Sequence, residues 1–138
     1  MKTLYTAEVT ATGGRSGHVK SSDGVIDIDV TVPEGLGGKN GASNPEQLFA
    51  AGYASCFQSA LMLVAGKQKV QIEKDSTVTA HVSLNQLDDE SYGLSVKLDV
   101  DLKSLDKEQA NQLVKQAHEV CPYSVGTRGN INVELNVI

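Results

Sequence analysis

The side chains best suited to redox or nucleophilic chemistry are the two cysteines, Cys56 and Cys121. A free cysteine taken alone can equally be a small buried hydrophobe. Two cysteines in a chain of 138 residues do not make a disulfide framework. Each stands in a segment whose apolar residues recur at helical spacing, so we expect the fold to bring them together. A peroxide-reactive thiol with a resolving thiol requires that arrangement.

A reactive thiol also needs a positive neighbour that lowers its pKa. Arginine occurs only at Arg15 and Arg128. Arg15 stands in the loop sequence GGRSG, where both a surface position and an inward-turned guanidinium are open. Glu46 lies in the first turn of an expected helix, where compensation of the helix dipole is a sufficient role. It also offers the bidentate carboxylate that a buried arginine would need.

Three alternatives use the same residues differently. His18, His81 and His118 could join the cysteines in a zinc site, but neither C-x-x-C nor H-x-x-x-H spacing is present, so no metal is expected. A cysteine hydrolase would pair Cys56 with His118 as the base. A structural or ligand-binding stress protein would keep both cysteines inert in its core.

Length and composition set further bounds. A chain of 138 residues that is 40% hydrophobic predicts one domain over residues 1–138. A net charge of −5 argues against nucleic-acid binding. The Gly38-Lys39 pair does not match the spacing of a phosphate loop. The N-terminal segment lacks the apolar stretch of a signal peptide, and no apolar run reaches the ~20 residues of a membrane span. We therefore expect no membrane association and a cytoplasmic location, where thiols stay reduced.

The elements that must position these residues follow from the pattern. Residues 4–14 predict a strand and turn, and residues 18–33 predict a hairpin around Asp23-Gly24. Residues 34–43 contain four glycines and predict a flexible loop or lid. A long helix should begin after the N-cap Asn44, with a capping box closed by Gln47, and end near Gly66. Its small residues 50–55 favour a central helix that is buried or packed on a partner subunit.

The C-terminal half predicts the remaining sheet. Residues 70–102 predict two or three strands with a turn at residues 88–91. A second helix should start after Asp106 and end at Cys121, because Pro122 follows. Residues 129–138 alternate cleanly as a final strand. The order of strands and helices predicts an α+β fold.

Three stretches resemble the organic hydroperoxide resistance branch of the Ohr/OsmC family: ATGGRSGHVKSSDG, ASNPEQLFAAGYASCF and VCPYSVGTRGNI. They occur in order across nearly the whole chain. Ser16 stands where this branch commonly has Asp, and Val125-Gly126 replaces a more usual Asn-Ala. Neither departure touches a residue with an expected catalytic role.

The resemblance implies an OsmC-like α+β fold, with antiparallel sheets around two helices and an intertwined homodimer built on a long central helix. It implies a thiol peroxidase that reduces alkyl and fatty-acid hydroperoxides to alcohols without a cofactor. Carried onto this chain, Cys56 is the peroxidatic cysteine, Cys121 the resolving one, and Arg15 with Glu46 the activating pair. The reductant that the resemblance implies is the dithiol of a lipoylated protein.

Apolar side chains near the cysteines should favour alkyl peroxides over hydrogen peroxide, because each Å² of apolar surface buried is worth ~25 cal/mol. The substrate contacts we expect are Leu36, Phe49, Phe57, Met62 and Tyr123. Glu46 and Cys56 are ten positions apart, or ~15 Å along a continuous helix. Either Arg15 spans part of that gap, the helix is broken, or Glu46 serves the Cys56 of a partner chain. We favour the last, a site built across the dimer interface.

Overall fold

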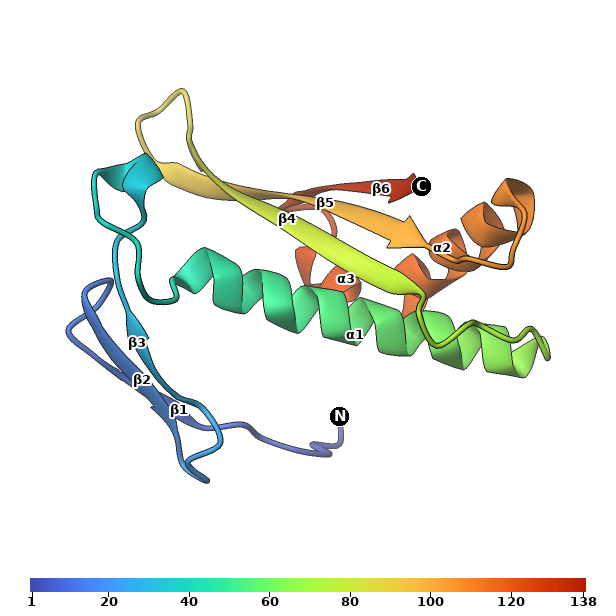
Figure 1. Cartoon of the computed structure of the whole chain (residues 1–138), viewed down its shortest axis with the longest axis horizontal. Coiled ribbons are helices and arrows are strands. Elements are labelled where there is room, and N and C mark those ends of the chain that lie inside the picture. The colour runs from blue at the N-terminus through green and yellow to red at the C-terminus, as the bar shows by residue number, and fades with distance from the viewer. The chain divides into compact units, whose positions relative to one another are not determined.

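The computed structural model describes residues 1–138 as two compact units, residues 1–48 and 49–138. The mixture of strands and helices confirms the predicted α+β class (Figure 1). The prediction of a single domain over the whole chain stays a prediction. In chain order the elements are β1 (Val9–Thr12), β2 (Gly17–Ser21), β3 (Asp27–Val30), the short 3-10 helix η1 (Glu34–Leu36), α1 (Pro45–Lys67), β4 (Thr77–Gln86), β5 (Tyr92–Asp101), α2 (Lys107–Val120), α3 (Pro122–Thr127) and β6 (Asn132–Val137).

The first unit is built on an antiparallel sheet in the order β1-β2-β3. The predicted turn between β2 and β3 is present, since the Asp23 carboxylate accepts hydrogen bonds from Ser21 Oγ and the Val25 N–H. Gly24 has a φ of +76°, which glycine adopts without strain. The expected loop at residues 34–43 contains η1, and Asn40 Oδ1 accepts a hydrogen bond from the Glu34 N–H at 2.9 Å. This segment is therefore more ordered than its four glycines suggest.

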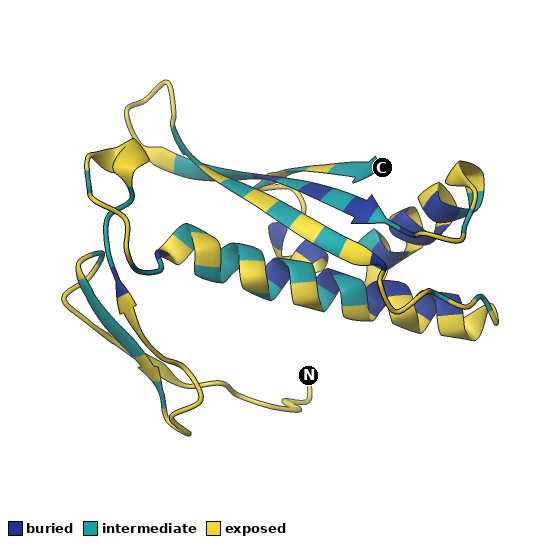
Figure 2. Ribbon diagram, in the orientation of Figure 1, coloured by how far each residue is buried: buried dark blue, intermediate teal, exposed yellow.

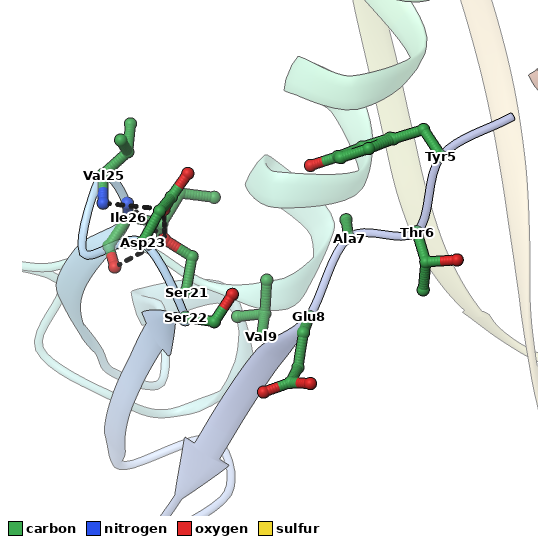
Figure 3. Close-up of a pocket in the computed structure, with 10 residues that line it drawn as sticks. All are labelled: Tyr5, Thr6, Ala7, Glu8, Val9, Ser21, Ser22, Asp23, Val25 and Ile26. Atoms are coloured by element: carbon green, nitrogen blue, oxygen red, sulfur yellow. Dashed lines mark hydrogen bonds between the residues drawn. The ribbon is translucent and has the colours of Figure 1, made fainter.

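This first unit has almost no hydrophobic core of its own. Val30 is its one buried hydrophobic side chain (Figure 2). A hollow of about 370 Å³ lies between residues 5–9 and the turn that joins β2 to β3 (Figure 3). Its apolar lining includes Tyr5, Val9 and Val25, which are exposed. Within the sheet itself, Val9 of β1 and Ile28 of β3 are also exposed, although a three-stranded sheet needs a covered apolar face for stability.

Helix α1 begins as predicted. Asn44 Oδ1 accepts a hydrogen bond from the Gln47 N–H at 2.8 Å, which satisfies one free donor of the first turn. The predicted capping box does not close, because the Gln47 side chain instead accepts a hydrogen bond from Ser43 Oγ. The helix then runs unbroken to Lys67.

Helix α1 has a buried face and an exposed face. The buried face carries Tyr53, Phe57 and Leu61, whereas Ser55, Ser59 and Met62 are exposed. By length and composition alone the helix could cross a membrane, a test that the core helix of a soluble protein also passes.

The second unit contains the sheet β4-β5-β6. Strands β4 and β5 form a long antiparallel hairpin, and β6 pairs in parallel with β5. The expectation of antiparallel sheets is therefore wrong for this last pair. The physical reason is that the chain crosses over through α2 and α3 before β6 returns to the sheet. Residues 70–76 contain no strand, so the expected two or three strands are two.

The hydrophobic core lies in this second unit. Strand β5 contributes Val96, Leu98 and Val100 at alternating positions, as one face of a strand must. Helix α1 contributes the buried face described above. Helix α2 starts at the predicted N-cap, where Asp106 Oδ1 accepts a hydrogen bond from the Gln109 N–H. The buried residues of α2 recur at helical spacing and are Ala110, Leu113, Val114 and Ala117.

Candidate active site

The fold brings the two cysteines together. The sulfurs of Cys56 and Cys121 lie 3.7 Å apart as free thiols, with the Cys121 S–H donating to Cys56 Sγ. Cys56 lies near the middle of α1 and is half-buried, whereas Cys121 is fully buried. A thiol with partial access to solvent is thus paired with one that is shielded from it.

The position of Cys121 follows from the proline after it. Proline disfavours the helical conformation of the preceding residue, and Cys121 has φ −62° and ψ 123°, which ends α2. Its N–H still donates to the Ala117 carbonyl at 2.8 Å. Pro122 is then the first residue of α3, a position that suits proline. Helix α3 was not predicted from the sequence, although proline at a first helical position was an available signal.

The surroundings of Cys56 within the second unit do not favour its thiolate. Burial, most of all, raises the pKa of the Cys56 thiol, and the neighbouring Cys121 raises it further. The backbone N–H of Tyr123 acts in the opposite direction. No cation is among the groups that shift this pKa. An activated Cys56 therefore needs a positive group beyond this immediate environment.

Three aromatic rings pack beside the cysteine pair. Phe49 and Tyr123 meet edge-to-face with ring centroids 6.0 Å apart, and Tyr53 and Tyr123 are 5.6 Å apart. Gly52 lies under the Tyr123 ring, since a Cβ at this position would come within 2.6 Å of Tyr123 Oη. The small residue at position 52 is what lets α3 lie close to α1.

Arg15 and Glu46 form the predicted two-point pair in the first unit. Arg15 Nη1 donates to Glu46 Oε2 at 2.9 Å, and Nη2 donates to Glu46 Oε1 at 2.7 Å. The Glu46 side chain is 14% exposed and the Arg15 side chain 40%. Hydrogen bonding to Arg15 lowers the pKa of Glu46, while hydrogen bonding to Glu46 raises the pKa of Arg15. Both groups are therefore charged at neutral pH.

The other expected substrate contacts differ in exposure. Phe49 is partly buried and Tyr123 is 39% exposed, so both have surface that a ligand can touch. Phe57 is fully buried in the core and has none. Met62 lies on the exposed face of α1, and Leu36 is exposed in η1 of the first unit.

His118 is not paired with either cysteine. His118 Nδ1 is hydrogen-bonded to Ser124 Oγ at 2.8 Å, and no hydrogen bond connects this ring to either sulfur. Burial and the nearby Arg128 charge lower the pKa of His118. No group of three or more potential ligands is arranged to hold a metal. The cysteine–histidine pair of a hydrolase is thus not formed here.

Substitution of Gly52 tests the packing of Tyr123. Alanine is more favourable than glycine inside a helix by about 1 kcal/mol. A Cβ added at Gly66 meets no other atom, so Gly66→Ala should stabilise the protein by up to that amount. Gly52→Ala should gain less or lose stability, because the new methyl displaces the Tyr123 ring. Urea unfolding and near-ultraviolet circular dichroism measure both effects. An equal gain for the two variants would contradict the packing described.

The acid dependence of stability tests the Arg15–Glu46 pair. Because Arg15 holds the pKa of folded Glu46 below its ordinary 4.5, the pair stabilises the protein above about pH 4.5. That contribution is lost as the pH falls through the lowered pKa. Glu46→Gln should cost about 0.2–1 kcal/mol at pH 7 and progressively less in acid, measured by denaturant unfolding. Glu73→Gln, at a carboxylate without a salt bridge, is the control for the loss of one negative charge and should cost less stability at pH 7 than Glu46→Gln.

Comparison with known proteins places this arrangement in a family. Residues 38–136 match the family described as OsmC-like protein. The chain is 50% identical over 137 residues to the organic hydroperoxide resistance protein OhrB of Bacillus subtilis, covering 97% of this chain and 98% of that protein. It is 44% identical over 137 residues to the organic hydroperoxide resistance protein of Xanthomonas axonopodis, covering 99% and 96%.

A crystal structure of an organic hydroperoxide resistance protein from Legionella pneumophila superposes with a TM-score of 0.92 at 48% identity, covering 99% of this chain and 98% of that one. These matches confirm the predicted resemblance and the OsmC-like α+β fold of the single chain, whereas the intertwined homodimer stays a prediction. The chain belongs to the OsmC-like family, within its organic hydroperoxide resistance branch.

Proposed function

We propose that this protein detoxifies organic hydroperoxides as a peroxidase that uses the Cys56–Cys121 dithiol. The observation that carries the proposal is the 3.7 Å approach of the two sulfurs. The names of its relatives, which refer to organic hydroperoxide resistance, support this class of substrate.

The first step is attack of the Cys56 thiolate on the distal oxygen of the hydroperoxide. The oxygen–oxygen bond breaks, and the alkoxide leaves and takes up a proton to become the alcohol. Cys56 becomes a sulfenic acid. A positive group beside the departing oxygen stabilises the charge that develops there.

The second step joins the two sulfurs. The Cys121 sulfur attacks the sulfenic sulfur of Cys56, and the hydroxide leaves as water after protonation. A disulfide bond is about 2.05 Å long, so the sulfurs need to approach by about 1.6 Å from their reduced separation. That movement is small enough for side-chain rotation and slight backbone adjustment.

The cycle closes by thiol–disulfide exchange with an external dithiol. The family resemblance points to the lipoyl group of a lipoylated protein as this reductant. The reducing cytoplasm is the compartment in which both thiols remain available. Phe49 and Tyr123 are the side chains with free apolar surface beside the cysteines, and they favour an alkyl or fatty-acid chain.

The cation that activates Cys56 is Arg15 in this proposal, and Glu46 holds the guanidinium by its two-point contact. Two observations support a homodimer in which the partner's Arg15 serves Cys56. Glu46 and Cys56 lie ten residues apart on the unbroken α1, or ~15 Å along its axis. The first unit also lacks a core, and the exposed face of α1 is left uncovered. An intertwined dimer covers both surfaces.

Reaction of the reduced protein with cumene hydroperoxide, beside hydrogen peroxide, tests the chemistry. Mass spectrometry should find a Cys56–Cys121 disulfide that forms at least about tenfold faster with the alkyl peroxide. Cys121→Ser should consume one peroxide per chain without turnover, because nothing resolves the sulfenic acid. Cys56→Ser should consume none. Thiols that stay reduced in the wild type would refute the proposal, and esterase activity retained in Cys121→Ser would favour a hydrolase.

Complementation tests the shared site. Arg15→Gln and Cys56→Ser chains, each with its own affinity tag, are co-expressed and the mixed dimer is isolated. If each site takes its arginine from the partner, this dimer has one complete site and recovers about half of the wild-type rate, whereas each variant homodimer is inactive. A mixed dimer as inactive as the Arg15→Gln homodimer would show that both residues act within one chain.

A further inference from the structure

A chain of hydrogen bonds, buried except at His118, links the helices that carry the two cysteines and takes no part in the proposed chemical steps. Tyr53 Oη is hydrogen-bonded to Ser124 Oγ at 2.8 Å, and Ser124 Oγ is also hydrogen-bonded to His118 Nδ1 at 2.8 Å. Thr127 Oγ1 lies 3.3 Å from Tyr53 Oη. Tyr53 and Ser124 are both fully buried. These contacts join three separate helices through one serine hydroxyl.

The members of this chain lie one helical turn from each cysteine. Tyr53 precedes Cys56 by three residues on α1, which places the two side chains on the same side of the helix. His118 and Ser124 lie three residues before and after Cys121. The hydrogen bonds therefore connect the turns next to the two sulfurs rather than distant parts of the fold.

These hydrogen bonds span the junction between α2 and α3, where the helical conformation is broken at Cys121. Helix α2 ends at Val120 and α3 begins at Pro122, so Cys121 is the single residue that joins the two helices. The His118–Ser124 contact bridges this junction from one side to the other. A second hydrogen bond spans the same junction, because Arg128 Nη2 donates to the His118 carbonyl at 2.7 Å. The Tyr53–Ser124 contact then fixes α3 to α1.

We propose that Tyr53, Ser124 and His118 are positioning residues that hold Cys121 within reach of Cys56. Opening of the α2–α3 junction would break the part-buried His118–Ser124 hydrogen bond and strain the buried Tyr53–Ser124 hydrogen bond. The closed junction keeps the effective concentration of Cys121 at the Cys56 sulfur high. The benefit of this arrangement rests on the proposed peroxidase function. Cys121 traps the Cys56 sulfenic acid before a second peroxide oxidises it to sulfinic acid.

Packing alone is the competing explanation, because a buried tyrosine hydroxyl and a buried serine need partners in any fold. The two explanations differ in what Tyr53→Phe changes. This substitution keeps the ring and removes only the hydroxyl. A packing role predicts a loss of stability with an unchanged dithiol, whereas a positioning role also predicts a change in how readily the two sulfurs join.

The first experiment measures the dithiol without peroxide. Reduced wild type, Tyr53→Phe and Ser124→Ala are equilibrated with glutathione buffers, and the effective concentration of the two thiols is obtained from the disulfide fraction. The effective concentration in each variant should be lower than in the wild type by about fivefold or more, the factor that corresponds to one net hydrogen bond. Tyr92→Phe and Ser104→Ala, at an exposed tyrosine and an exposed serine outside α1, are the matched controls and should match the wild type.

The second experiment uses cumene hydroperoxide. Tyr53→Phe should consume its first peroxide at the wild-type rate but convert a severalfold larger fraction of Cys56 to sulfinic acid, measured by mass spectrometry. His118→Asn, whose amide can reach Ser124, should resemble the wild type more closely than His118→Leu. Circular dichroism confirms that each variant is folded.

The outcomes separate the two proposals. Unchanged effective concentrations in folded Tyr53→Phe and Ser124→Ala would overturn the positioning role, even if both melt at lower temperature. A wild type that forms the disulfide in glutathione buffers but ignores the peroxide would refute the peroxidase function and leave the positioning role standing.

Discussion

The rest of the structure depends on the approach of the buried Cys121 sulfur to Cys56 at the end of α2. Pro122 stops α2 at Cys121 and starts α3, so the thiol lies at a corner instead of inside a helix. The absence of a side chain at Gly52 lets Tyr123 of α3 lie against α1. A proline and a glycine, 70 positions apart, thus set the separation of the two sulfurs from opposite sides.

Geometry alone does not make Cys56 reactive. Burial raises the pKa of its thiol, and its partner thiol adds to that effect. The charge that would offset this burial is available in the first unit, where Glu46 fixes the Arg15 guanidinium in a two-point contact. The first unit also lacks a hydrophobic core. In the proposed dimer the partner supplies both the missing covering surface and the missing charge, so we propose that assembly and activation are one requirement.

Local signals in the sequence were reliable where a few neighbouring residues decide the structure. Asp106 caps α2, Asn44 caps α1, and Asp23-Gly24 turns the hairpin, since each contact involves residues within three or four positions. Local signals failed where two partners compete for one group. Gln47 bonds Ser43 instead of closing a capping box. The parallel pairing of β6 with β5 was also missed, because alternation of apolar residues is the same in either direction.

The sequence by itself predicted the α+β class and, through its resemblance to a known family, the pairing of Cys56 with Cys121 and of Arg15 with Glu46. Residue types and short motifs carry that information directly. The tertiary structure decided the 3.7 Å separation of the sulfurs, the full burial of Phe57, and the hydrogen-bonded chain from Tyr53 to His118. These depend on how α1, α2 and α3 pack, and contacts between residues about 70 positions apart leave no periodic pattern in a single sequence.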